Sequence, residues 1–118
     1  MRSISFPMLD GLDVSVMRLS ACAPTWHNGA VTRHDVLPRD TSLLMYIRSG
    51  RWDYEVNGRV VQTVTPGDVL FLPVGCRYIS RCTVADEATA IGLDFHLMDE
   101  SGEELSLGDA PQVLLHDG

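Results

Sequence analysis

Short apolar segments with a period of two residues recur along this chain, and none shows the 3.6-residue period of an amphipathic helix. Side chains of a β-strand alternate between two faces, so this pattern predicts strands with distinct faces. Turn residues separate the segments. The predicted strands cover Leu12–Ser20, Ala30–Val36, Ser42–Ser49, Arg51–Val56, Arg59–Val64, Val69–Leu72, Arg77–Cys82 and Ala88–Leu97, with a last short strand at Pro111–His116.

Three turns fix the connections in the middle of the chain. Asn57-Gly58 predicts a type I′ hairpin, because both residues tolerate a positive φ. Pro66-Gly67-Asp68 and Pro73-Val74-Gly75 bracket the apolar strand between them. Many short strands joined by turns, with no helix between them, are typical of an antiparallel sandwich or jelly roll. The sequence therefore predicts an all-β protein.

Composition and charge limit the classes of function that this chain can have. A chain of 118 residues that is 45% hydrophobic predicts one domain with one core. Sixteen acidic against nine basic residues give a net charge of −7, which repels nucleic acid. The three cysteines form no CxxC pair, and their odd number argues against a disulfide framework. Because the chain also lacks a signal-like apolar region and a membrane-length run, we expect a cytoplasmic protein with no membrane partner.

Two segments resemble the paired motifs of the cupin superfamily. SGRWDYEVNGR (Ser49–Arg59) is followed closely by TPGDVLFLPVGCRY (Thr65–Tyr78). The second cupin motif places a glycine, a proline, a second glycine and a histidine at fixed intervals. The residues here at those positions are Gly67, Pro73, Gly75 and Tyr78. The resemblance covers about residues 30–97 and implies a cupin fold, a double-stranded β-helix (jelly-roll) barrel of antiparallel strands.

The metal ligands of the cupin motifs are absent from this sequence. Counting back from Gly50, the glutamate position holds Leu43 and the histidine pair falls within residues 36–39. Tyr78 stands at the remaining histidine position. A divalent ion needs converging imidazole or carboxylate ligands, which these residues do not supply. We expect a barrel without a metal ion or other cofactor.

Within the cupins, the chain resembles the N-terminal sensing domain of AraC-family transcription regulators. The resemblance rests on the motifs above, on Phe95 late in a long strand, and on the acidic loop DESGEEL and the PQV segment that follow. In that family a dimerising helix and two DNA-binding helix-turn-helix motifs come next, and this chain ends before them. We therefore expect a sensor fragment of a longer regulator.

The AraC resemblance also implies an organisation and partners. It implies a core at residues 30–97, an N-terminal arm at 1–29 and an acidic loop with a short strand at 98–118. The expected assembly is a homodimer that binds a small polar metabolite, such as a sugar. It would contact DNA only through the helix-turn-helix region that this chain lacks.

Polar residues on barrel-facing strand positions are the candidate effector contacts. Tyr78 and Ser80 share a face that points inward in the cupin register, the alternative being a core Tyr78 with a satisfied hydroxyl. Small residues at 88, 90 and 92 predict a pocket with Asp94 and His96 at its rim, unless that strand is half exposed. The predicted ligand-binding residues are Tyr78, Ser80, Asp94, His96, His34, Arg33, Met45 and Tyr54.

Several of these assignments keep an alternative. His34 and Arg33 lie on opposite faces of one strand, so only one of them points inward. Core packing is the favoured interpretation of Trp52 and Tyr54, although Tyr54 is also a candidate contact. Trp26 either caps the barrel mouth or covers an edge.

A stand-alone cupin enzyme of the isomerase or dioxygenase type is the alternative function. It would need a noncanonical metal site, and the spacing of His27, His34 and His96 matches no ligand motif. Cys76 lies beside Arg77, but no histidine partner is fixed near it, so we expect no catalytic residues and no enzymatic activity. An interaction module without a ligand is a further alternative.

Overall fold

The computed structural model describes residues 1–84 and 87–116, which form twelve strands and one short 3₁₀ helix, η1. The last two residues of the predicted C-terminal segment lie outside the described residues. The elements are β1 (Arg2–Ser3), η1 (Phe6–Gly11), β2 (Ser15–Cys22), β3 (Thr25–His27), β4 (Val31–Arg33), β5 (Ser42–Ser49), β6 (Arg51–Val56), β7 (Arg59–Val64), β8 (Val69–Leu72), β9 (Ile79–Thr83), β10 (Glu87–Met98), β11 (Leu105–Ser106) and β12 (Gln112–Leu115).

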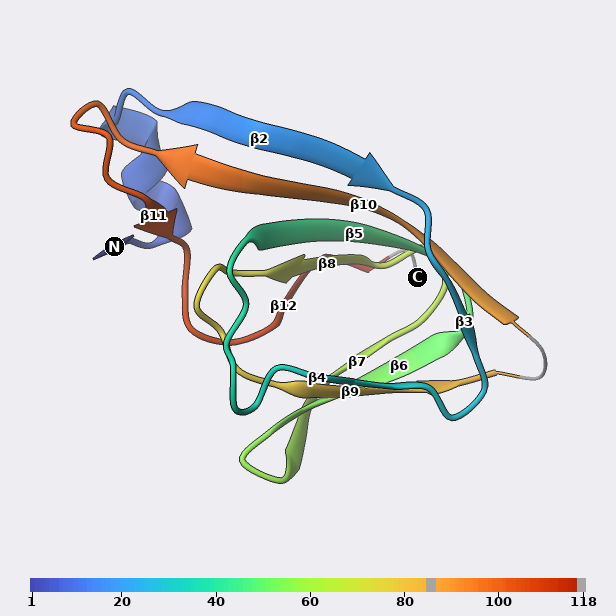
Figure 1. Cartoon of the computed structure of the whole chain (residues 1–118). Helices are drawn as coiled ribbons and strands as arrows, with labels where there is room; N and C mark the ends of the chain where they lie inside the picture. Colours follow the sequence, from blue (N-terminus) through green and yellow to red (C-terminus); the bar gives the residue numbers. More distant parts are fainter. Residues whose placement is uncertain (85–86, 117–118) are drawn as a thin grey trace.

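Two antiparallel sheets face each other across the interior (Figure 1). The larger sheet has the order β12-β8-β5-β10-β2, with β3 pairing the far end of β10. The smaller sheet has the order β4-β9-β6-β7. Strands β2 and β10 extend together beyond one end of the two layers, where η1, β1 and β11 lie (Figure 1). The predicted all-β jelly roll is confirmed.

The hydrophobic core lies between the two sheets. Ile47, Leu70 and Val64 are fully buried there, and Trp52 is 2% exposed. A second apolar cluster joins Phe71 and Leu97 to the segment around β11. No helix among the described residues has the length and apolar character needed to cross a membrane.

The predicted turns form as expected. Asn57 and Gly58 both have positive φ, 53° and 76°, in the β6–β7 hairpin. Gly50, between β5 and β6, has φ 90° and lies against β10. A Cβ atom at Gly50 would lie 2.4 Å from the Cβ of Ala88, so this connection requires glycine both for its backbone and for its packing.

The N-terminal region differs most from the sequence expectation. Residues 6–11 form the helix η1, which the sequence analysis did not predict; Pro7 lies in its first turn and supplies a suitable φ. The strand expected at Leu12–Ser20 begins only at Ser15. Much of the segment expected as an arm, residues 1–29, contributes β2 and β3 to the larger sheet.

The strand expected at Ala30–Val36 is shorter than predicted. It covers only Val31–Arg33, although the amide of His34 still donates to the carbonyl of Tyr78 over 2.8 Å. The chain then leaves the sheet through the segment that carries Pro38 and Arg39 before β5 begins. This excursion brings Arg39 to one end of the space between the two sheets.

Candidate ligand-binding site

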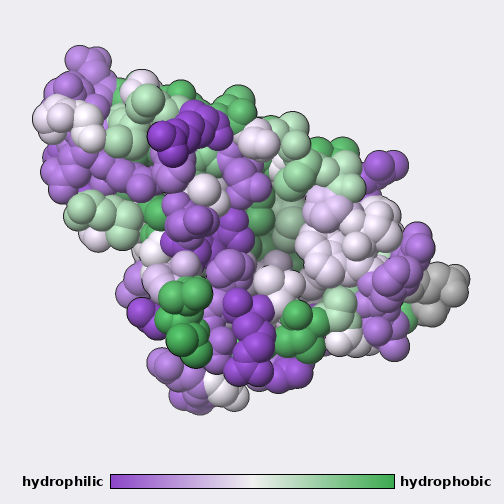
Figure 2. All heavy atoms as spheres, viewed as in Figure 1, coloured by the Kyte–Doolittle hydropathy of each residue, from purple (hydrophilic) through white to green (hydrophobic). Residues whose placement is uncertain are grey.

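A cavity of about 180 Å³ lies between the two sheets. The space-filling view shows a recess between the two layers with apolar residues at its floor (Figure 2). The smaller sheet supplies one wall of the cavity, the larger sheet the opposite wall, and aromatic and charged groups occupy its two ends.

The wall from the smaller sheet is lined with hydroxyl groups. Thr32 on β4 pairs with Ser80 on β9, and Ser80 pairs with Tyr54 on β6, so the three side chains lie in one row on one face. Within residues 1–84 and 87–116, no protein group hydrogen-bonds these three hydroxyls, yet every fully enclosed side-chain nitrogen or oxygen has a partner. These hydroxyls therefore remain accessible from the cavity.

The opposite wall is apolar. Leu43 and Met45 on β5 and Leu72 on β8 line it. The small-residue face of β10 points inward, with Ala88 and Ala90 at most 1% exposed. However, a Cβ atom on Gly92 would lie 3.0 Å from Cys22 Sγ and 3.1 Å from Leu43 Cδ1. The volume beside Gly92 is thus already filled, and the expectation that these small residues create the empty space is wrong at this position.

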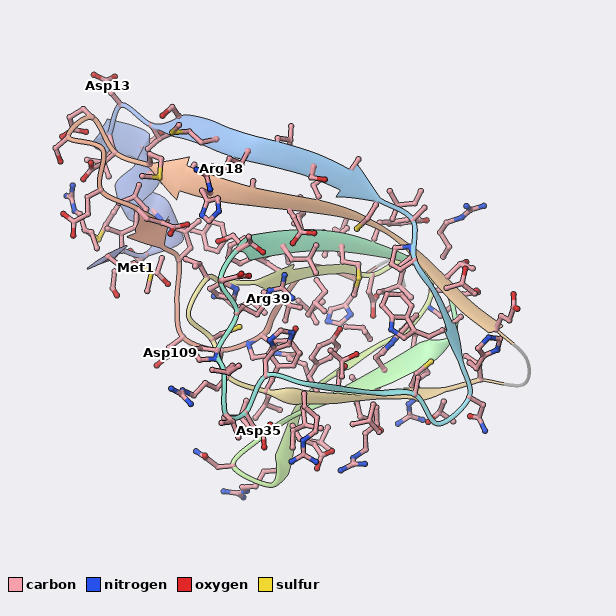
Figure 3. The ribbon with its side chains drawn as sticks, in the orientation of Figure 1. Met1, Asp13, Arg18, Asp35, Arg39 and Asp109 are labelled. Carbon is pink, nitrogen blue, oxygen red and sulfur yellow. The ribbon has the colours of Figure 1, made fainter. Side chains whose placement is uncertain are left out.

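A partly buried arginine, Arg39, lines one end of the cavity between the two sheets (Figure 3). Arg39 donates from Nη1 to the Tyr78 hydroxyl over 3.1 Å and from Nη2 to Asp94 Oδ1 over 3.0 Å. Thr41 accepts from Nη2 at 3.0 Å and donates to Asp94 Oδ1 over 2.9 Å. The Arg39 side chain is 12% exposed and that of Asp94 34%. This network fixes the guanidinium, and its charge is largely balanced by Asp94.

Burial and charge act against each other on the ionisable groups of this network. Burial lowers the pKa of Arg39, but Tyr78, Asp94 and Cys76 together outweigh burial and hold the pKa above its ordinary value. Burial raises the pKa of the Tyr78 phenol, although the neighbouring Arg39 opposes the shift. Arg39 therefore stays charged and Tyr78 stays protonated at neutral pH.

Aromatic rings form the other end and part of the hydroxyl wall. Trp26 on β3 packs edge-on against Trp52 on β6, with ring centroids 5.2 Å apart at an interplanar angle of 83°. Both rings line the cavity. The rings of Tyr54 and Tyr78 lie 5.3 Å apart, and that of His34 lies 5.1 Å from Tyr78. A ligand in the cavity would contact an aromatic end, a hydroxyl wall and a guanidinium.

Five of the eight predicted site residues line this cavity. His34 faces the same side of β4 as Thr32 and packs against Tyr78, but it borders a separate outer hollow rather than the cavity. Arg33 points outward, where it pairs with Asp35 over 2.9 Å. The five lining residues are Tyr78, Ser80, Asp94, Met45 and Tyr54.

His96 is a correction to the sequence interpretation. The pairing of β10 with β5 ends at Phe95, which faces Ser42 at the start of β5, so His96 lies beyond the cavity. There its Nδ1 lies 2.6 Å from Glu104 Oε2, and it borders a different hollow. Asp94, two residues earlier on β10, accepts a hydrogen bond from Arg39 at the end of the cavity. Asp94 and His96 therefore belong to different hollows.

Sequence reasoning missed several lining residues. Arg39 was considered only as a metal-ligand position, and a lone basic residue after Pro38 gave no sign that it would be buried. Thr32 was not considered, although the inward direction of His34 would have implied it. Trp52 was assigned to the core, and Trp26, which was expected to cap the mouth or cover an edge, lines the cavity.

The residues at the cupin metal positions do not fit a metal ion. Leu43 offers no ligand atom, and Tyr78 accepts a hydrogen bond from a guanidinium, which would repel a cation. Among the described residues, no three His, Cys, Asp or Glu side chains cluster in a way that could hold a metal ion. His27, His34 and His96, which the structure describes, form no such cluster.

Comparison with known proteins identifies the architecture. A cupin described as RmlC-like, from Shewanella frigidimarina, superposes with a TM-score of 0.53 at 21% identity, over 72% of this chain and 76% of that one. The chain has the cupin fold. No family model matches the sequence of this chain, and no curated protein matches it.

Two transcription regulators also contain a domain with this cupin architecture. ToxT from Vibrio cholerae, solved with a bound unsaturated fatty acid, superposes with a TM-score of 0.53 at 13% identity over 64% of this chain. The cupin domain of an XRE-family regulator from Enterobacter cloacae gives 0.52 at 11% identity, over 70% of this chain and 94% of that one. The chain spans only 28% of the length of ToxT.

Proposed function

We propose that this cupin is the effector-binding domain of an AraC-type transcription regulator and that a small polar metabolite occupies the cavity between its sheets. The observation that carries the proposal is the row of hydroxyls on Thr32, Ser80 and Tyr54 that face the cavity and that no described protein group hydrogen-bonds. Polar groups inside a protein are normally hydrogen-bonded, so a ligand that pairs with them is favoured over an apolar one.

The volume of the cavity limits the size of the ligand. Its volume of about 180 Å³ is below the usual range of about 300–1,000 Å³ for drug-sized ligands. A cavity of about 150 Å³ is known to accept benzene, so the ligand is expected to contain one ring or five to six carbon atoms. The apolar wall at Leu43 and Leu72 and the rings of Trp26 and Trp52 suit the carbon skeleton, and a monosaccharide or small polyol is the leading candidate.

The regulator part of the proposal is supported by the cupin domains of two transcription regulators. ToxT belongs to the AraC family, which agrees with the motif resemblance of the sequence. The chain itself has a net charge of −7, so contact with DNA is assigned to a helix-turn-helix region outside it. In this proposal the domain binds and signals, with no catalytic step.

We also propose that the domain works as a homodimer in the cytoplasm. The outer face of the larger sheet exposes apolar side chains, including Tyr46 at 45% and Ile91 at 44%, which a partner copy would cover. The cysteines of the described chain are unpaired, as is usual in a reducing compartment. Ligand binding would shift the dimer arrangement only to the extent that it favours one arrangement over another.

The test is a thermal-shift screen of neutral sugars, polyols and small carboxylates on the wild-type domain. A ligand that binds only the folded state raises the melting temperature by mass action. Ser80→Leu, which fills the cavity, should abolish the shift produced by any hit. Its matched control is Thr83→Leu, on the same strand but exposed, which should retain the shift. An unchanged shift in Ser80→Leu would place the ligand elsewhere and refute the proposal.

A further inference from the structure

Another hollow, of about 200 Å³, lies outside the ligand-binding cavity, where β2 and β10 extend together beyond Ser42, the first residue of β5. Figure 3 shows Arg18 on this extension of β2 beside β10. The hollow is lined by two thioethers, an imidazole, a carboxylate and a guanidinium. These belong to Met17, Met98, His96, Glu104 and Arg18.

Strand register brings the two methionines and the histidine to one face. His96 on β10 pairs directly with Met17 on β2. Directly opposed residues of an antiparallel pair have Cβ atoms about 5 Å apart. Met98 follows His96 by two residues, so it points to the same side about 7 Å further along the strand. Methionine side chains have three rotatable bonds, which lets both sulfur atoms approach the imidazole.

The histidine is oriented for coordination through its other nitrogen. Its Nδ1 lies 2.6 Å from Glu104 Oε2, which leaves Nε2 free for a ligand. A carboxylate on one ring nitrogen is the common arrangement of metal-bound histidines, because it fixes the ring and its tautomer. The side chains of His96 and Glu104 are both 23% exposed, so the pair is partly shielded while the hollow remains open to an entering ion.

The ligand types and the local charge select the metal. Thioether sulfur is a soft ligand that favours Cu(I), and imidazole also suits copper. The one carboxylate here is engaged by His96, and the Arg18 guanidinium adjoins the hollow without an ion pair to any described residue. A neighbouring positive charge penalises a divalent ion about twice as much as a monovalent one.

The backbone supports this geometry with a strained residue. The pairing of β2 with β10 changes register between Asp94 and His96, and the additional residue lies on β2. Arg18 has a φ of 55°, which is rare for a residue with a side chain and typical of a β-bulge. Such strain concentrates at functional positions. The bulge sets the register in which Met17 faces His96.

We propose that Met17, His96 and Met98 bind one Cu(I) ion, with Glu104 as the residue that positions His96. This site is distinct from the cupin metal positions and does not depend on the proposed effector. It requires no redox step, because the ion is bound in its reduced form.

The experiment is an anaerobic Cu(I) titration of the full chain in excess ascorbate, in competition with the chromophoric chelator bicinchoninate. It uses a Cys22→Ser background, because Cys22 is an exposed thiol that would itself bind Cu(I). Burial raises the pKa of the Cys76 thiol to about 11, so this residue stays protonated at neutral pH and competes poorly. We expect one Cu(I) per chain to be withdrawn from the chelator.

Variants then assign the ligands. Met17→Leu and Met98→Leu keep the side-chain volume and should each weaken Cu(I) affinity at least tenfold, and the double variant should abolish binding. Glu104→Gln should weaken affinity about 10- to 100-fold, as expected for a residue that orients a ligand. Met8→Leu, in η1 and 49% exposed, is the matched control and should leave affinity unchanged.

Three results would overturn the proposal. They are the failure to withdraw Cu(I) from the chelator, undiminished affinity in the double methionine variant, and displacement of Cu(I) by equimolar Zn²⁺ from the same residues. X-ray absorption of the loaded protein should show two sulfur ligands and one nitrogen ligand. Circular dichroism of each variant checks that loss of binding is not loss of fold.

Discussion

Arg39 and Tyr78 are joined by a hydrogen bond of 3.1 Å from Nη1 to the phenolic oxygen, although the two residues are 39 positions apart. Arg39 lies in the segment between β4 and β5, and Tyr78 directly precedes β9. The bond therefore connects the loop at the end of the cavity to the wall that carries the hydroxyl row. A cation buried in this way orders the cavity end and offers a ligand a fixed donor.

Replacing Arg39 should reduce both stability and ligand binding. Arg39→Met removes the hydrogen bonds to Tyr78, Thr41 and Asp94, and we expect a loss of about 1–3 kcal/mol in the free energy of unfolding. Arg39→Lys keeps the charge but not the planar guanidinium. Its free energy of unfolding should therefore lie between those of the wild type and Arg39→Met. Urea denaturation measures the change; equal stability of Arg39→Met and wild type would contradict the network's role.

Removing the cavity hydroxyls should separate binding from stability. Ser80→Ala and Tyr54→Phe delete groups that no described protein atom hydrogen-bonds, so the free energy of unfolding should change by less than about 1 kcal/mol. Each substitution should lower the affinity for a ligand found in the thermal-shift screen by about tenfold, because a polar group of the ligand loses its hydrogen-bond partner. Isothermal titration calorimetry gives the affinities.

Thr41→Val is the control for those two variants. Its hydroxyl bonds both Arg39 and Asp94, so its loss should destabilise the fold by about 1–3 kcal/mol. If Ser80→Ala is as destabilising as Thr41→Val, the Ser80 hydroxyl has a structural role and not a ligand-binding one.

The domain should lose stability at alkaline pH. Burial raises the pKa of the Cys76 thiol from an ordinary value near 9 to about 11. Since the folded-state pKa is the higher one, the contribution is fully present below pH 9 and is lost as pH rises from 9 to 11. About 2–3 kcal/mol is expected from this group. Urea denaturation between pH 8 and pH 11 measures it, and Cys76→Ala should flatten the curve through the lower part of this range.

Two glycines with positive φ should respond very differently to alanine. Gly50→Ala places a Cβ atom 2.4 Å from that of Ala88 in addition to the unfavourable φ, and we expect a loss of more than about 3 kcal/mol. Gly58→Ala has a comparable φ but no atom within 4 Å of the new Cβ, so only about 1 kcal/mol should be lost. Similar melting temperatures for the two variants would show that β10 does not pack closely on this turn.

Dimerisation should depend on the outer face of the larger sheet. Ile91→Asp puts a charge into the exposed apolar face, and sedimentation equilibrium should then show only monomer. Because each copy carries a charge of −7, raising the salt concentration should strengthen the wild-type dimer by screening repulsion. A wild-type protein that remains monomeric at millimolar concentration would contradict the proposed assembly.

The sequence alone determined the central strands β5 to β8, the turns that join them and the fold class, but not η1, β1, β3 or β11. Asn57, Gly58 and Gly67 have the positive φ that their residue types tolerate, and alternation with a period of two identifies strands from neighbouring residues only. The residues at the cupin metal positions could likewise be read directly, because they follow from spacing along one chain.

Only the tertiary structure decided which polar residues meet. Arg39 reaches Tyr78 and Asp94 because the chain leaves the sheet after β4, and a loop path is set by distant packing rather than by local pattern. His96 follows Asp94 by two residues, but β5 begins at Ser42, which pairs with Phe95, so only Asp94 reaches the cavity. The bulge at Arg18 depends on how β2 pairs with β10, since register is a property of two strands and cannot be read from one.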